Sequence, residues 1–162
     1  MFIIDESLYI RALEKAIQNF REGNGNLKKI EFLLSKIKLV TKDKRYKTSL
    51  LHFAVDSKVP DEIFQLIVNA FKIRGLSLDT LSSGRYTAMD TAFLFGNVPA
   101  IKILFQEGAD SDRIKPDSQI SYFEYFKQNY PERYVELCDF IQTRKVPQHT
   151  FLGNRPKHEK VD

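Results

Sequence analysis

The chain has 162 residues, of which 43% are apolar, and it carries 13 Phe, 7 Tyr, no Trp and a formal charge of +4. This length suits one domain with a working core, and the density of aromatic and aliphatic residues excludes disorder throughout the chain. The single Cys excludes a disulfide framework, and no apolar run approaches the roughly 20 residues of a membrane span. With no visible secretory signal at the N-terminus, we expect a soluble cytoplasmic protein.

Helical periodicity dominates the chain. Apolar residues recur at three- and four-residue spacing in the segments 9–20, 27–37, 63–71, 98–105 and 134–141. Turn signals rich in Gly, Asn and Ser separate these segments. Pro60, Pro99 and Pro131 each stand where a helix would begin, a position at which the missing N–H has no helical partner to lose. Because sustained period-2 alternation is absent, the pattern predicts an all-α protein of short antiparallel helices in pairs.

The pairs repeat along the chain. Segment 96–105, shifted by 71 positions, falls on segment 25–34 with the same Gly-Asn pair and the same apolar spacing. Thr87 aligns with Ser121 after 34 positions and with Ser49 after 38. Each of these hydroxyls is expected to open a short helix and to accept from a free N–H of its first turn. The sequence therefore contains a repeat of about 34–38 residues.

Segment 86–110, YTAMDTAFLFGNVPAIKILFQEGAD, resembles an ankyrin repeat. The family pattern is Thr-Pro-Leu-His-x-Ala, then Gly-Asn or Gly-His, an apolar helix ending in paired Leu, and Gly-Ala-Asp. The residues that fit it directly are Thr87, Ala92, Gly96, Asn97, Leu104, Gly108, Ala109 and Asp110. Segment 49–55 fits the first-helix motif through Leu51, His52 and Ala54. Segments 25–34 and 121–126 fit as degenerate ends, as terminal repeats that face water should.

The resemblance implies an ankyrin-repeat solenoid over residues 1–142, followed by a flexible basic tail at 143–162. Its repeats would span approximately 7–40, 43–80, 84–114 and 117–142. Hairpin tips near 42–47, 82–85 and 112–118 would join the first helices in forming a concave groove. The residues with structural roles would be Ser49, His52, Thr87, Gly96, Asn97 and Gly108, and His52 would bond to backbone around the hairpin.

The departures from the family pattern are also informative. The family Pro is Leu50, Ala88 and Tyr122 in this chain, and the family His becomes Asp90 and Glu124. Segment 72–85 is longer than a standard hairpin connection, and we expect a protruding or irregular loop there.

Such an architecture implies a non-catalytic module that binds another protein as an adaptor, inhibitor or scaffold, and that acts as a monomer. Its contacts would come from the tips and from exposed first-helix positions, which include Phe53, Thr91 and Leu94. The candidate contact residues are Lys44, Arg45, Tyr46, Lys47, Asp56, Arg85, Tyr86, Asp90 and Phe93.

No pattern in the sequence predicts catalysis, a metal or a cofactor. Cys138 shares an apolar helix face with Leu137 and Ile141, which indicates a small core residue rather than a reactive thiolate. His149 and His158 have no nearby cluster of ligand residues, so zinc is not expected.

The charge is unevenly distributed. Segment 28–47 carries eight basic and two acidic residues, a net charge of +6, whereas segment 48–142 carries nine basic and thirteen acidic, a net −4. The basic segment and the tail leave open nucleic-acid or anionic-surface binding, or simply a solvated face. A further alternative is a bacterial effector acting on host proteins, because small divergent ankyrin proteins are frequent among such effectors.

Overall fold

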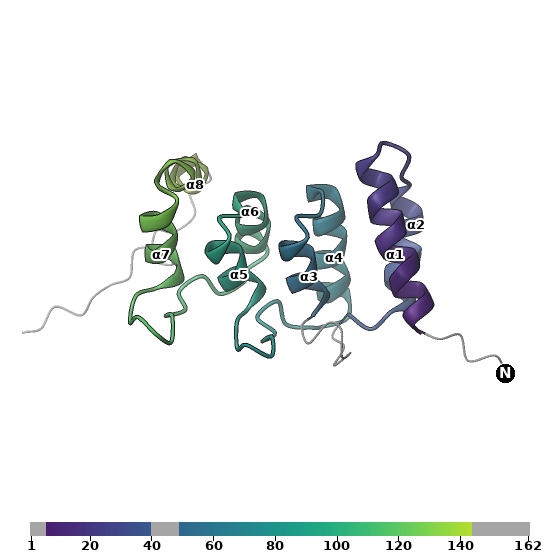
Figure 1. Cartoon of the computed structure of the whole chain (residues 1–162), viewed down its shortest axis with the longest axis horizontal. Coiled ribbons are helices and arrows are strands. Elements are labelled where there is room, and N and C mark those ends of the chain that lie inside the picture. Colours follow the sequence, from purple (N-terminus) through teal and green to yellow (C-terminus); the bar gives the residue numbers. More distant parts are fainter. Residues whose placement is uncertain (1–5, 40–48, 144–162) are drawn as a thin grey trace, which may run out of the picture.

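The computed structural model describes residues 6–39 and 49–143, and over these ranges the chain is all-α (Figure 1). The helices are α1 (Glu6–Arg21), α2 (Leu27–Lys36), α3 (Leu50–Asp56), α4 (Asp61–Ile73), α5 (Ala88–Leu94), α6 (Val98–Gln106), α7 (Tyr122–Asn129) and α8 (Pro131–Thr143). The only β-type pairing in the described ranges is an isolated bridge between Ile114 and Ser121. The expected all-α class is confirmed. None of these helices, over the described residues, has the length and apolarity needed to cross a membrane.

The helix starts follow the local sequence. Asn26 accepts from the backbone N–H groups of the first turn of α2, and Ser121 accepts from that of Glu124 at 3.0 Å. Thr87 and Asp90 form a reciprocal capping box at the start of α5. Ser49 also precedes a helix, but its side chain makes no cap bond. Each of the three prolines stands at a helix start: Pro60 caps α4, Pro99 lies in the first turn of α6 and Pro131 is the first residue of α8.

The helices pack as four pairs in a row, α1 with α2, α3 with α4, α5 with α6 and α7 with α8 (Figure 1). The first helices α3, α5 and α7 contact one another in sequence, and so do the second helices α2, α4, α6 and α8. The loops that lead into α5 and α7 project from the same side of the row (Figure 1). Equivalent positions of successive pairs therefore lie side by side.

The apolar core continues along the whole row. Its largest fully buried side chains include Phe64 and Phe71 on α4, Phe93 on α5, and Tyr122 and Phe126 on α7. The ring of Phe93 lies 5.8 Å from that of Phe126, so the core bridges the third and fourth pairs. Each pair buries its apolar face against its neighbours, which makes the row a single stack.

Arginine side chains join neighbouring pairs through backbone carbonyl groups at or just after helix ends. A helix leaves its last carbonyls without an intrahelical partner, and a guanidinium can donate to them. We call these contacts arginine clamps: Arg21 donates to the carbonyl of Ser57, Arg74 to those of Leu34 and Ile37 (both 2.6 Å), and Arg133 to that of Gly96 (2.9 Å). The donor and the acceptor belong to different pairs in every clamp.

Candidate functional site

The first described tip lies between α4 and α5, where the sequence predicts an irregular loop. The backbone N–H of Ser82 donates to the carbonyl of Tyr86 at 2.8 Å, and Arg85 has a φ of +64°. The hydroxyl of Ser82 accepts from the N–H of Tyr86 at 3.2 Å. This tight turn leaves Arg85 exposed and the Tyr86 side chain 37% exposed.

The second tip lies between α6 and α7 and has hairpin geometry. The N–H of Lys115 donates to the carbonyl of Ile120 at 2.9 Å, and the N–H of Tyr122 donates to that of Arg113 at 3.1 Å. Lys115 also pairs with Asp117 at 2.7 Å, and this hydrogen bond lowers the pKa of the Asp117 carboxyl. Ile114 is 62% exposed at this tip.

His52 connects the second pair to the first tip. Its Nε2 lies 2.8 Å from the Tyr86 carbonyl and its Nδ1 lies 2.9 Å from the Ser49 hydroxyl. The imidazole therefore donates from Nε2 and accepts at Nδ1 in its neutral form, which explains why Ser49 makes no helix cap. Burial lowers the pKa of His52, so the charged form is disfavoured.

Asp90 makes comparable contacts with backbone and with a tip one pair further along the stack. Its Oδ2 accepts from the N–H of Thr87 at 2.8 Å and lies 3.0 Å from Nε of Arg113, which belongs to the second tip. Arg113 in turn donates from Nη2 to the carbonyl of Arg85 at 3.1 Å. Burial raises the pKa of Asp90, against the opposing effect of Thr87 and Arg113. This carboxylate thus ties the two tips together.

Two of the expected contact residues are corrected by the structure. Asp90 and Phe93 are 1% and 0% exposed, so neither is available to a partner. Asp90 turns inward because its carboxylate closes the capping box and meets Arg113, and Phe93 fills the core between α5 and α7. Thr91, another expected surface position, is buried as well, while Phe53 and Leu94 are half-buried.

Asp56, Arg85 and Tyr86 are exposed, as the sequence predicts. Asp56 ends α3 on a different part of the stack from the tip that carries Arg85 and Tyr86. The expected tip residues Lys44, Arg45, Tyr46 and Lys47, and the tail, lie outside the described residues. The residue-level prediction omits Ile114 and Phe95, which are 62% and 54% exposed. An apolar residue between charged neighbours in a predicted tip is the signal that identifies Ile114.

The remaining motif residues lie at turns. Gly96, between α5 and α6, has a φ of +62°, and a Cβ there would lie 2.7 Å from Nη1 of Arg133. Asn97 accepts from the N–H of Ala100 at 3.3 Å and donates to the carbonyl of Val55 at 3.2 Å. Gly108 follows the end of α6. These residues shape turns and cap helices, and they present few side-chain groups that a partner could contact.

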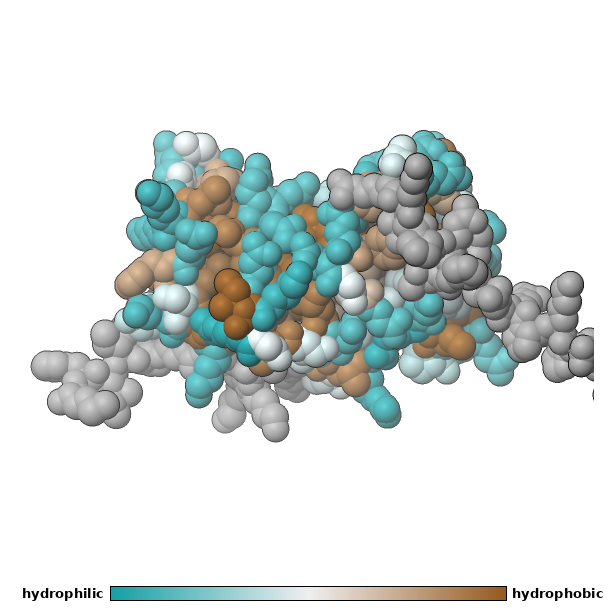
Figure 2. Space-filling view, turned by 180° about the vertical axis from the view of Figure 1, so that it is seen from behind, coloured by the Kyte–Doolittle hydropathy of each residue, from teal (hydrophilic) through white to brown (hydrophobic). Residues whose placement is uncertain are grey.

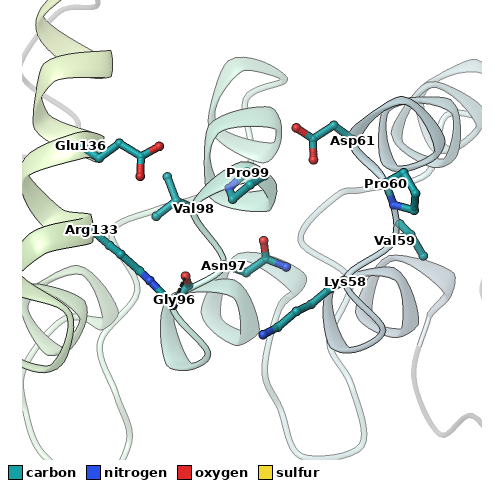
Figure 3. A pocket seen from close by; sticks show the side chains of 10 residues that line it. All are labelled: Lys58, Val59, Pro60, Asp61, Gly96, Asn97, Val98, Pro99, Arg133 and Glu136. Carbon is teal, nitrogen blue, oxygen red and sulfur yellow. Dashed lines mark hydrogen bonds between the residues drawn. The ribbon is translucent and has the colours of Figure 1, made fainter. Parts of the chain in front are cut away.

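A pocket of about 450 Å³ opens among the α3–α4 turn, the α5–α6 turn and α8 (Figure 3). Its charges are mixed, because Lys58 and Arg133 face a lining that also contains Asp61 and Glu136. Arg133 reaches toward Gly96 (Figure 3) and is engaged in its clamp, and Glu136 accepts from Lys102 at 2.6 Å. Two of these four charged side chains, Arg133 and Glu136, are therefore engaged in contacts within the protein. The pocket does not concentrate charge of one sign.

No group of three or more His, Cys, Asp or Glu side chains that could hold a metal occurs among the described residues. Cys138 is half-buried on α8, where its hydrogen bond with Tyr134 is the main cause that raises the pKa of Tyr134 to about 12. The perturbed pKa values of His52 and Asp90 accompany hydrogen bonds within the protein. Burial also raises the pKa of Tyr122 to about 12, and its hydroxyl has no hydrogen-bond partner among the described residues.

Comparisons add no relative: the chain matches no protein-family model, no curated protein and no solved structure.

Proposed function

We propose that the chain is a small, divergent ankyrin-repeat protein that binds another protein through its tips and does no chemistry of its own. Three features support the family. The helices form stacked pairs, Thr87 and Ser121 cap short first helices, and His52 bonds to backbone at the next tip. These are the roles that the resemblance implies for the repeat motif.

The observation that carries the binding function is the exposure of anchor-type side chains on rigid tips. Arg85 and the 37% exposed Tyr86 lie at the first tip, and the 62% exposed Ile114 lies at the second. Tyr, Arg and large apolar residues supply most of the binding energy in protein interfaces. The Tyr86 carbonyl accepts from both Ser82 and His52, so the turn is ordered before a partner arrives. Pre-ordering lowers the entropy that binding must overcome.

Affinity capture with matched variants tests this proposal. The tip variant Tyr86→Ser with Ile114→Ser removes both anchors, and Ile73→Ser is the control, because Ile73 is 86% exposed at the end of α4. We expect proteins captured by the wild type and by the control to be lost from the tip variant. A loss of tenfold or more in affinity corresponds to about 1.4 kcal/mol. Equal capture by all three proteins would show that the tips are not the binding surface.

A further inference from the structure

The lysines of α2 differ from those of the other second helices. Lys72 on α4 pairs with Glu107 after α6, and Lys102 on α6 pairs with Glu136 on α8 at 2.6 Å. Lys28, Lys29 and Lys36 on α2 form no ion pair with any residue in the described ranges. We call the ion pairs Lys72–Glu107 and Lys102–Glu136 the charge ladder. The ladder neutralises charge between neighbouring pairs, but it stops before α2.

An exposed aromatic ring lies among these unpaired lysines. Phe32 is 56% exposed, and its helix neighbours at positions −4, −3 and +4 are Lys28, Lys29 and Lys36. Nζ of Lys36 lies 5.2 Å from the centre of the ring. We call Lys28, Lys29, Phe32 and Lys36 the α2 patch. Figure 2 shows the side of the stack on which the second helices lie, with hydrophilic side chains over most of the surface.

We propose that the α2 patch binds an extended acidic segment of a partner protein, with an apolar side chain on Phe32 and carboxylates on the lysines on either side. Charge complementarity selects the acidic groups, since three ammonium groups without an ion-pair partner in the described ranges stand beside an apolar anchor.

The spacing of the α2 patch defines the pattern of this segment. Lys28 and Lys36 lie eight residues apart, about 12 Å along the helix axis at 1.5 Å per residue. In an extended chain, residues i, i+2 and i+4 point to one face and span about 13 Å. A segment with acidic residues at i and i+4 and an apolar residue at i+2 therefore matches the three points. Lys29, next to Lys28, strengthens the charge at one end.

Two other anionic partners fit the α2 patch less well. A membrane needs several apolar side chains on one face. The exposed apolar side chains of α2 are Phe32 and the 36% exposed Leu27, whereas Ile30, Leu33 and Leu34 are buried. A nucleic-acid base stacks on a ring face, and Lys36 lies over one face of the single exposed aromatic ring of α2, Phe32. An acidic peptide needs one apolar contact with the Phe32 ring and the ammonium groups beside it.

This surface is separate from the tips, because α2 belongs to the row of second helices. The proposal therefore goes beyond the function proposed above, and either can fail without the other.

The experiment measures the binding of a fluorescent peptide to the full chain by anisotropy. The probe is a nine-residue peptide with two glutamates that flank a leucine at two-residue spacing. A scrambled peptide of the same composition is the control probe. The variants are Phe32→Ser, the triple change Lys28→Gln, Lys29→Gln and Lys36→Gln, and the control Ile73→Ser. All substituted side chains are exposed, and thermal unfolding by circular dichroism checks that each variant keeps its helices.

We expect the wild type and Ile73→Ser to bind the probe and to prefer it at least tenfold over the scrambled peptide. Phe32→Ser and the triple variant should each weaken binding at least tenfold, and only the triple variant should also lose most of its salt dependence. Absence of binding at low salt, or binding that neither variant weakens, would overturn the proposal. A single-stranded oligouridylate or a phosphatidylserine vesicle that binds more tightly than the peptide, and through Phe32, would also overturn it.

Discussion

His52 and Asp90 occupy equivalent places, each three residues after the hydroxyl residue that precedes its helix. His52 reaches the next tip as a neutral ring that donates to the Tyr86 carbonyl, at 2.8 Å. Asp90 reaches the following tip as a carboxylate beside Arg113, at 3.0 Å. Both side chains lie buried, and both hydrogen-bond to backbone groups that precede a helix of the stack. Different chemistry thus meets the same requirement in successive pairs.

The pH dependence of folding should report on His52. Its pKa is lowered by burial in the folded protein, so the unfolded chain binds a proton at higher pH than the folded protein does. As the pH falls below about 6.5, stability is therefore lost, at up to about 1.4 kcal/mol per pH unit until the folded pKa is reached. Urea unfolding at a series of pH values between about 7.5 and 5.5 measures this slope.

The variant His52→Gln is the control, because it keeps a donor and an acceptor but does not titrate. It should be less stable than the wild type at pH 7 and should show a flatter slope. Asp56 and Asp90 have raised pKa values, and their protonation favours the folded state on acidification, so they cannot imitate the loss. A slope that is unchanged in His52→Gln would contradict the assignment.

At the scale of elements, the turn between α5 and α6 is a place of close approach between the third and fourth helix pairs. The hydroxyl of Tyr130 donates to the Leu94 carbonyl at 2.8 Å, and Arg133 donates to the carbonyl of Gly96. Gly96 admits both because it has no side chain: a Cβ would lie 2.9 Å from the Tyr130 ring. The glycine is required twice, once for its φ of +62° and once for this approach.

The variant Gly96→Ala separates these two requirements when it is compared with Gly23→Ala. Gly23 also has a positive φ, +80°, but a Cβ there would meet nothing within 4 Å. We expect Gly23→Ala to cost about 1 kcal/mol through backbone strain alone, and Gly96→Ala to cost about 2–3 kcal/mol. Urea unfolding gives both values. Equal losses would mean that Tyr130 and Arg133 move aside freely.

The sequence predicts elements better than it predicts which face of an element is exposed. The prolines and the Asn and hydroxyl caps mark most helix starts, because capping depends on neighbours within three or four residues. Short first helices such as α5, with seven residues, carry too few turns for periodicity to fix their buried side. The exposure of Asp90 and Phe93 is therefore predicted wrongly, although the Thr-x-x-Asp spacing of a capping box is visible.

Contacts between distant segments lie beyond local patterns. Arg113 follows Asp90 by 23 residues, and nothing near either residue marks them as partners. The absence of a cap bond at Ser49 has a similar cause. The Ser49 hydroxyl hydrogen-bonds to Nδ1 of His52, whose orientation is set by the bond of Nε2 to the Tyr86 carbonyl at the next tip. The tips could be placed by register, but the hydrogen bonds that shape them could not.

At the scale of the whole molecule, the arginine clamps couple one pair to the next. Arg74 at the end of α4 donates to two carbonyls at the end of α2, so the first pair depends on the second for its closing contacts. In a stack whose stability is a sum of repeat and interface terms, such a contact sets how independently an end pair opens.

The variant Arg74→Ala should loosen the first pair selectively. We expect a loss of about 1–2 kcal/mol in global stability, with faster amide hydrogen exchange in α2 than in the wild type and unchanged exchange in α6. Arg11→Ala is the control, because Arg11 is exposed on α1 and takes part in no clamp. Hydrogen exchange with mass spectrometry resolves the two helices. Uniform acceleration along the stack would contradict local coupling.

The joints between pairs combine different donor side chains with one kind of acceptor, a backbone carbonyl. Arg21 and Arg74 close the first joint, Asn97 reaches back across the second to the Val55 carbonyl, and Tyr130 and Arg133 close the third. In each of these contacts the acceptor is a backbone carbonyl, which does not depend on the side chain of the accepting residue. The accepting helix end can therefore change in sequence without losing the contact, whereas the donating Arg, Asn or Tyr cannot be replaced by an apolar residue.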